Sequence, residues 1–194
     1  MQLANKLTEK LVLFQIIKEE DKDLYSYGIW QGVILLFNYT TIIIISCFFQ
    51  MLWHGIIFTA SYSLLRSYAG GYHARTQTRC YLFSVIMIIV VHCLIKFVNW
   101  NHITLITSIT LSCATILYLA PIEDENKALD EKEYLVFKKR THIILFNLII
   151  CIMLFKFVKQ HKICVCITMA ICVSAFMLIL AKIKKYKQHW FLSQ

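Results

Sequence analysis

Long apolar runs alternate with short polar segments along most of the chain. At about 1.5 Å per residue, a helical run of roughly 20 residues crosses the ~30 Å hydrocarbon core of a bilayer. Backbone N–H and C=O groups in lipid must bond within their own segment, so such runs are expected to be helices. The pattern predicts an all-α, polytopic membrane helix bundle with about six transmembrane helices, at residues 29–48, 53–66, 81–98, 103–120, 143–158 and 163–181.

The first apolar stretch is longer than one span requires. Residues 29–65 would form a helix nearly twice as long as the hydrocarbon core is thick. We expect this stretch to be divided into two spans, with the turn near Gln50, His54 and Gly55. One long tilted helix is the alternative, and the hydropathy pattern leaves both open.

An amphipathic segment precedes the spans. Leu3, Leu7 and Leu11 recur at helical spacing, while Lys6 and Lys10 lie off that stripe. We therefore expect residues 3–18 to form a helix that lies in the membrane interface and ends at the polar residues 21–23. A cleaved signal peptide is not expected, because residues 1–28 are too polar to contain its apolar region.

Composition supports a membrane protein and excludes other classes. Of 194 residues, 59% are hydrophobic, and the mean hydropathy of +0.63 is rare in a soluble domain. The net charge of +9 comes from clusters between apolar runs, without a nucleic-acid-binding motif. Most of the eight cysteines lie inside apolar runs and no CxxC occurs, so we expect no disulfide framework. No metal-ligand spacing links the histidines, so we expect no metal site. Residues 1–194 are expected to form one domain, since no internal repeat is present.

The basic residues predict an orientation in the membrane. If both termini face the cytoplasm, sixteen of the twenty Lys and Arg residues fall in cytoplasmic segments. This agrees with the positive-inside rule and places the polar loop 66–80 on the cytoplasmic side. All eleven Asp and Glu residues lie outside the spans, in segments 9–23 and 123–133, which argues against an intramembrane proton relay.

The polar loop 66–80 carries the residues with the clearest chemical potential. Cys80 is the only cysteine at the edge of a polar loop on the predicted cytoplasmic side, and His73 is the only histidine in that loop. A thiol needs a base or a cationic neighbour to act as a thiolate near neutral pH. His73 can supply both, and Arg75 and Arg79 add positive charge. Cys80 is therefore a candidate nucleophile and His73 its candidate base.

The spacing of this pair sets a geometric requirement. Residues seven apart in a straight helix share a face but are separated by a rise of ~10.5 Å. The backbone between 73 and 80 must therefore bend, or the pair must close when substrate binds. Gly70 and Gly71 permit a sharp entry into the loop. Gln77 and an acid from 123–133 are candidates for a third, orienting group. Judged from these residues alone, a Cys and a His in one loop are more often incidental than catalytic. The neighbouring arginines would then only set the topology of the chain in the membrane.

The same loop resembles that of a known family. The stretch 66–80, with Ala69-Gly70-Gly71-Tyr72-His73-Ala74 followed by Cys80, resembles the accessory gene regulator protein B (AgrB) family of Gram-positive bacteria. The resemblance extends to chain length, to the order of the apolar runs, and to Tyr118-Leu119-Ala120-Pro121 followed by a charged loop ending in Lys138-Lys139-Arg140. It covers nearly the whole chain, and the His/Cys loop is its most specific part.

The resemblance implies a thiol protease of peptide quorum sensing in the bacterial cell membrane. By this resemblance, Cys80 and His73 cleave off the acidic C-terminal part of a small AgrD-like propeptide. A Cys or Ser of the peptide then attacks the acyl-thioester on Cys80, which closes a thiolactone or lactone autoinducing peptide. The resemblance also implies a homodimer surrounded by membrane lipids, with no cofactor and no nucleic acid partner.

Basic side chains are candidates for binding the propeptide. Arg75 and Arg79 lie close to Cys80 in sequence, and Lys138, Lys139 and Arg140 could hold an acidic tail, although such a run is more often a topology anchor. Two other functions remain open: a non-catalytic membrane accessory or export protein that binds a peptide partner, and a membrane acyltransferase that uses the same cysteine.

Overall fold

The computed structural model describes residues 2–72, 76–123 and 130–192, and within these ranges every regular element is a helix. This confirms the predicted all-α class. By contacts, the chain divides into two compact units, Met1–Ile44 and Ile45–Gln194. The elements are α1 (Gln2–Leu13), η1 (Glu19–Asp21), α2 (Lys22–Phe48), α3 (Leu52–Ala69), α4 (Gln77–Phe97), α5 (His102–Leu119), α6 (Glu131–Phe157) and α7 (His161–Leu192).

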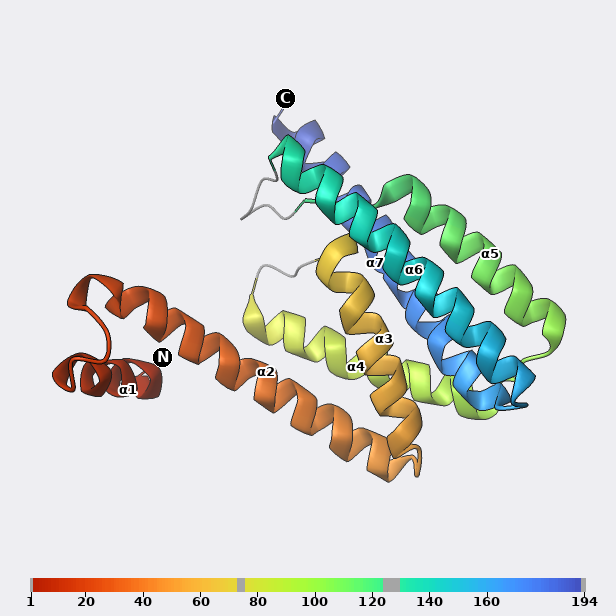
Figure 1. Ribbon diagram of the computed structural model, residues 1–194, viewed down its shortest axis with the longest axis horizontal. Coiled ribbons are helices and arrows are strands. Elements are labelled where there is room, and N and C mark those ends of the chain that lie inside the picture. Colours follow the sequence, from red (N-terminus) through yellow and green to blue (C-terminus); the bar gives the residue numbers. More distant parts are fainter. Residues whose placement is uncertain (1, 73–75, 124–129, 193–194) are drawn as a thin grey trace. The chain divides into compact units, whose positions relative to one another are not determined.

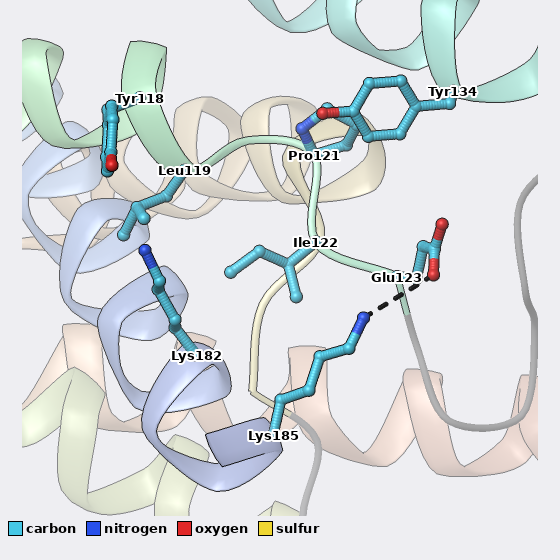
Figure 2. Close-up of a pocket in the computed structure, with 8 residues that line it drawn as sticks. All are labelled: Tyr118, Leu119, Pro121, Ile122, Glu123, Tyr134, Lys182 and Lys185. Carbon is cyan, nitrogen blue, oxygen red and sulfur yellow. Dashed lines mark ion pairs between the residues drawn. The ribbon is translucent and has the colours of Figure 1, made fainter. Parts of the chain in front are cut away.

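Helices α3 to α7 form the second unit and run in alternating directions (Figure 1). At one end of this unit, which we call the loop end, the segments that follow α3 and α5 meet the C-terminal part of α7. The Ile122 N–H donates to the Ala69 carbonyl at 3.1 Å, and the Lys185 ammonium lies 3.8 Å from the Glu123 carboxylate (Figure 2). Polar segments far apart in the sequence are thereby gathered at the loop end.

The opposite end of the second unit, which we call the turn end, contains the short connections 49–51, 98–101 and 158–160. His161 Nε2 donates to the Trp100 carbonyl at 2.8 Å, which joins the start of α7 to the connection before α5. Each helix from α3 to α7 therefore extends from one end of the unit to the other.

The central helix of this unit is α7. In the most apolar stretch of α7, 67% of the residues are buried. The corresponding share is 6–22% in the other four helices that are long and apolar enough to span a membrane. Many of its buried side chains are small, among them Cys164, Cys166, Ala170, Ser174 and Ala175. Small side chains let neighbouring helices approach closely, which favours association in lipid. The large apolar side chains of the surrounding helices are mostly exposed, as expected for lipid-facing surfaces.

Five helices in the described residues are long and apolar enough to cross a bilayer: Glu19–Phe48, Gln77–Phe97, His102–Leu119, Glu131–Phe157 and His161–Lys187. The protein is therefore a multi-pass membrane protein. Helix α3 has 18 residues but contains several polar side chains, such as His54, Ser61 and Arg66. The expectation of about six spans corresponds to the five apolar helices together with α3.

The stretch 29–66 contains a helix break, which confirms two helices rather than one. The break lies at 49–51, where Gln50 has a φ of 57° and the Met51 N–H donates to the Ser46 carbonyl at 2.8 Å. His54 and Gly55, which were expected near the turn, lie inside α3. The break therefore falls in the gap between the predicted spans 29–48 and 53–66, at Gln50.

Gly55 has a packing role instead of a turn role. A Cβ built there would collide with the Ser46 side chain and would lie 3.1 Å from His92 Nε2. Glycine at this position lets α3 pack closely against the end of α2 and against α4.

Two predicted boundaries were wrong because the helices extend beyond the apolar runs. Helix α6 begins at Glu131 rather than near residue 143, so Lys138, Lys139 and Arg140 lie in a helix and not in a loop. The Asp130 side chain caps it by accepting from the Glu131 N–H at 2.8 Å. Helix α7 likewise continues to residue 192, so the basic tail from Lys182 is helical through that residue.

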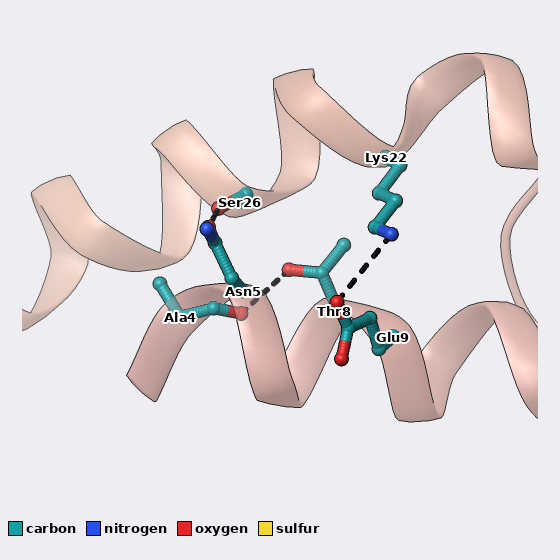
Figure 3. Close-up of polar contacts among 6 residues, drawn as sticks. All are labelled: Ala4, Asn5, Thr8, Glu9, Lys22 and Ser26. Atoms are coloured by element: carbon teal, nitrogen blue, oxygen red, sulfur yellow. Dashed lines mark hydrogen bonds and ion pairs between the residues drawn. The ribbon is translucent and has the colours of Figure 1, made fainter. Parts of the chain in front are cut away.

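The first unit contains α1 and most of α2. The predicted helix 3–18 is shorter than expected, since α1 ends at Leu13 and Gln15 has a φ of 56°. The small side chains Ala4 and Thr8 are buried, and Glu9 forms an ion pair with Lys22 at 3.6 Å (Figure 3). Helix α1 therefore packs on the start of α2 through small and polar side chains.

Candidate active site

The loop after α3 begins with a backbone contact to the segment after α5. The Gly70 N–H donates to the Arg66 carbonyl at 3.0 Å and ends the helix. Gly70 has φ 77° and ψ −155°, and it forms an isolated parallel bridge with Ile122. Gly71 also has a positive φ, of 146°. Such backbone angles favour glycine because a Cβ is poorly tolerated there.

Tyr72 is held by α3 and α7 together. Its N–H donates to the Met177 carbonyl at 3.1 Å, and its carbonyl accepts from Arg66 Nη2 at 2.8 Å. The Tyr72 ring lies 6.1 Å from the Phe83 ring, and the Lys184 ammonium lies 5.5 Å from its centroid. Both peptide groups of Tyr72 are thus fixed immediately before residue 73.

Cys80 lies in the first turn of α4. Thr76 caps this helix: its hydroxyl accepts from the Arg79 N–H at 3.4 Å, and its carbonyl accepts from the Cys80 N–H at 3.0 Å. The Cys80 side chain is half-buried, and its carbonyl accepts from the Ser84 hydroxyl. Cys80 therefore lies at the N-terminal end of α4, the end that carries the partial positive charge of the helix dipole.

A buried tyrosine and an arginine contact each other on one face of α3. Tyr62 is only 9% exposed, and its ring stacks on Phe58 with centroids 5.8 Å apart. Arg66 donates from Nη1 to the Tyr62 hydroxyl. Arg66 therefore connects the Tyr62 hydroxyl to the Tyr72 backbone.

Not all predicted site residues fall within the described part of the chain. His73 and Arg75 lie outside the described residues. Gln77, a candidate third group, is the exposed first residue of α4, and Arg79 is exposed in the same turn. The chain from Tyr72 to Cys80 is not one continuous helix, since α4 begins only at Gln77.

The three basic residues 138–140 of α6 differ in how exposed they are. Lys138 is half-buried, whereas Lys139 and Arg140 are exposed. Arg140 donates from Nη1 to the Tyr68 hydroxyl at 3.0 Å, and its guanidinium lies 5.1 Å from that ring. Arg140 thus joins α6 to the last turn of α3.

Two acids from 123–133 take structural positions. Glu123 forms its ion pair with Lys185, and Asp130 caps α6. Within the described ranges, no group of three His, Cys, Asp or Glu side chains is placed to hold a metal ion.

Sequence reasoning missed the side chains that position the loop. Arg66 was considered only as a topology-setting charge, although its place four residues after Tyr62 puts the two on one helix face. That spacing was a usable signal. The Met177 carbonyl could not have been found, because a backbone group carries no sequence signature.

Comparison with known proteins places these features in a family. A family profile described as "Accessory gene regulator B" matches residues 2–178 of the chain. A protein named AgrB-like from Clostridium perfringens (strain SM101 / Type A) is 27% identical over 132 residues, which is 64% of this chain and 62% of the relative. A second, AgrB-like protein 2 of Clostridium perfringens (strain 13 / Type A), is 27% identical over 94 residues, or 48% of this chain and 44% of the relative.

The alignments thus span less than two thirds of either relative's length. No solved structure matches the chain. The family profile, however, covers nearly all of it, including the loop that carries Gly70, Tyr72 and Cys80. The chain belongs to the accessory gene regulator B family.

Proposed function

We propose that this chain is a membrane-embedded cysteine endopeptidase that removes the C-terminal part of a small AgrD-like propeptide and closes the remainder into a ring. Membership of the family supports a role in processing a quorum-sensing peptide. The observation that carries the proposal is the position of Cys80, a half-buried thiol in the first turn of α4 next to a loop fixed at Gly70 and Tyr72.

In the proposed reaction, His73 takes the proton from the Cys80 thiol as the sulfur attacks a backbone carbonyl of the propeptide. The C–N bond then breaks, and His73 gives the proton to the departing amine. The C-terminal part of the propeptide leaves with a free amino group, and the N-terminal part remains as an acyl-thioester on Cys80.

Ring closure is a second acyl transfer. A Cys or Ser of the bound peptide attacks the thioester carbonyl while His73 takes the proton from its thiol or hydroxyl. The bond to Cys80 then breaks, and His73 passes this proton to the Cys80 sulfur. The product is a thiolactone or lactone. Because the thioester retains the acyl activation, no ATP is needed for this step. Water competes with the peptide nucleophile, so a half-buried sulfur favours cyclisation over hydrolysis.

The loop end faces the cytoplasm in this proposal. It carries Arg66, Arg79 and the basic residues at the start of α6 and at the end of α7, whereas the turn end carries Lys96, Lys156, Lys159 and Lys162. The positive-inside rule favours the end with more basic residues as the cytoplasmic one. Arg75, Arg79, Lys138, Lys139 and Arg140 then meet a cytoplasmic substrate. Assembly as a homodimer is part of the proposal through the resemblance.

The test is C-terminal trimming of a tagged candidate propeptide, co-expressed with the full chain in a bacterial membrane. The candidate is a small reading frame beside the gene that encodes an amphipathic leader, a central Cys or Ser and an acidic tail. We expect Cys80→Ala and His73→Ala to lower the rate of tail release by at least ~10³-fold, since both groups act in one step.

Cys93→Ala is the matched control, because Cys93 is also half-buried and lies further along α4. It should retain trimming, and all three variants should insert in the membrane at wild-type levels. Continued tail release by both Cys80→Ala and His73→Ala would refute the endopeptidase. Export of an uncut peptide by all variants would instead support the non-catalytic alternative.

A further inference from the structure

A pocket of about 420 Å³ opens at the loop end, between α7, the start of α6 and the segment after α5 (Figure 2). Its lining includes two lysines of α7, one carboxylate and two tyrosines, and Figure 2 shows the two ammonium groups on the same side of the Pro121–Glu123 segment. The charged and phenolic residues are Lys182, Lys185, Glu123, Tyr118 and Tyr134.

The pocket shares a backbone segment with the loop that precedes Cys80. Ile122 lines the pocket, while its N–H donates to Ala69 and its backbone pairs with Gly70. On α7, Lys184 lies over the Tyr72 ring, and its sequence neighbours Lys182 and Lys185 line the pocket. One turn of α7 therefore has the Tyr72 loop on one face and the pocket on another.

The pocket lining has a net positive charge among the described residues. The Lys182 ammonium lies 5.1 Å from the centroid of the Tyr118 ring. Among the lining residues described, no carboxylate forms an ion pair with Lys182. Lys185 pairs with Glu123 at 3.8 Å, but its side chain is 71% exposed. An exposed ion pair of this kind is weak and exchanges readily with another carboxylate.

We propose that this pocket binds carboxylate side chains of the propeptide on the leaving side of the cleaved bond, and that an incoming carboxylate replaces Glu123 on Lys185. The proposal rests on the proposed endopeptidase function and adds the place where the acidic segment binds. Lys182 and Lys185 supply the charge, and the tyrosine hydroxyls supply further donors. Both lysines lie beyond residue 178, where the family match ends.

A peptide occupant is favoured over an anionic lipid headgroup by the position of the pocket. Its wall is the extended segment that carries the bridge to Gly70, so the occupant contacts the same backbone that holds the Cys80 loop. A carboxylate of the protein, Glu123, already occupies the position that a peptide carboxylate would take.

Binding is measured on the purified full chain with Cys80→Ala, which separates binding from cleavage, in phosphatidylcholine vesicles. The probe is a fluorescent tetraglutamate peptide, with the tetraglutamine peptide as the neutral comparison. We expect Lys182→Gln with Lys185→Gln to weaken tetraglutamate binding about tenfold or more. Glu123→Gln should tighten tetraglutamate binding several-fold, because a competing carboxylate is removed. If the Glu123–Lys185 ion pair were purely structural, its loss would not tighten binding.

Lys187→Gln is the matched control, since Lys187 is an exposed lysine of the same helix outside the pocket lining. It should bind the probe as the parent does. Equal binding by the double-lysine variant and the parent overturns the pocket site, as does an equal loss in Lys187→Gln. If the pocket variants change only the association with phosphatidylglycerol vesicles, the pocket is a lipid headgroup site and the proposal fails.

The chain with Cys80 intact distinguishes this inference from the proposed function. For cleavage of the propeptide, we expect the double-lysine variant to raise KM about tenfold with kcat within about twofold of wild type. Normal cleavage by that variant overturns the pocket and leaves the endopeptidase standing. Cleavage that survives Cys80→Ala overturns the endopeptidase, and the probe measurement still decides whether the pocket binds acids.

Discussion

Gly70→Ala tests whether the bridge between the two loop segments holds the site in its working arrangement. Gly70 has φ 77° and ψ −155°, a region occupied almost only by glycine. A Cβ added there would collide with the Ile122 carbonyl oxygen and lie 3.2 Å from the carbonyl carbon. The alanine variant must therefore change its backbone angles and also move away from Ile122.

The expected cost follows from these two effects. Backbone strain at such a position is about 1–3 kcal/mol. Separation from Ile122 also loses the hydrogen bond from its N–H to Ala69, with a net value of about 1 kcal/mol. A total of roughly 2–4 kcal/mol reduces the population of the bridged loop by about 30- to 1000-fold, at tenfold for each ~1.4 kcal/mol. Tail release should fall by a similar factor.

The assay is the rate of propeptide tail release in membranes, together with thermal unfolding of the purified protein in detergent. Gly32→Ala is the control, because Gly32 lies within α2 with nothing within 4 Å of an added Cβ. It should leave tail release unchanged. Wild-type tail release by Gly70→Ala would refute the idea that the bridge positions the site, and an equal loss in Gly32→Ala would show that the effect is not specific.

Two further predictions concern packing and the arginine of α3. Gly55→Ala should lower the free energy of unfolding by about 1–3 kcal/mol, because the added Cβ would overlap the Ser46 side chain. The measurement is the melting temperature relative to that of Gly32→Ala, and equal melting temperatures would contradict the prediction. Arg66→Lys should lower the rate of tail release at least several-fold and leave the melting temperature unchanged. An ammonium cannot donate to both the Tyr62 hydroxyl and the Tyr72 carbonyl in the planar geometry of the guanidinium. Wild-type kinetics would show that these two contacts are not needed.

The helical class and the number of long helices were predictable from hydropathy. In lipid, only internally bonded segments are stable, so an apolar run such as 81–98 had to be helical. Boundaries were less predictable, because a helix continues into water where its residues favour it. The capped start of α6 at Asp130 and the continuation of α7 past Lys182 are the two examples.

The candidate site was only partly predictable. Cys80 and His73 were selected as chemically competent residue types in one polar loop, and that selection stays a prediction for His73, which lies outside the described residues. The support around Cys80 was not predicted, since it comes from helices distant in sequence. Tyr72 bonds to Met177, and Gly70 pairs with Ile122, both across long stretches of chain.

The sequence by itself determined that this protein is a bundle of membrane helices with one polar loop that contains a histidine and a cysteine, because hydropathy and residue chemistry are local properties. Only the tertiary structure decided that α7 is central, that Arg66 fixes the Tyr72 backbone, and that Lys182 and Lys185 share a pocket with Glu123. These relations depend on which helix faces pack together. Packing of that kind is set by side-chain size and close approach along whole helices, and no single segment encodes it.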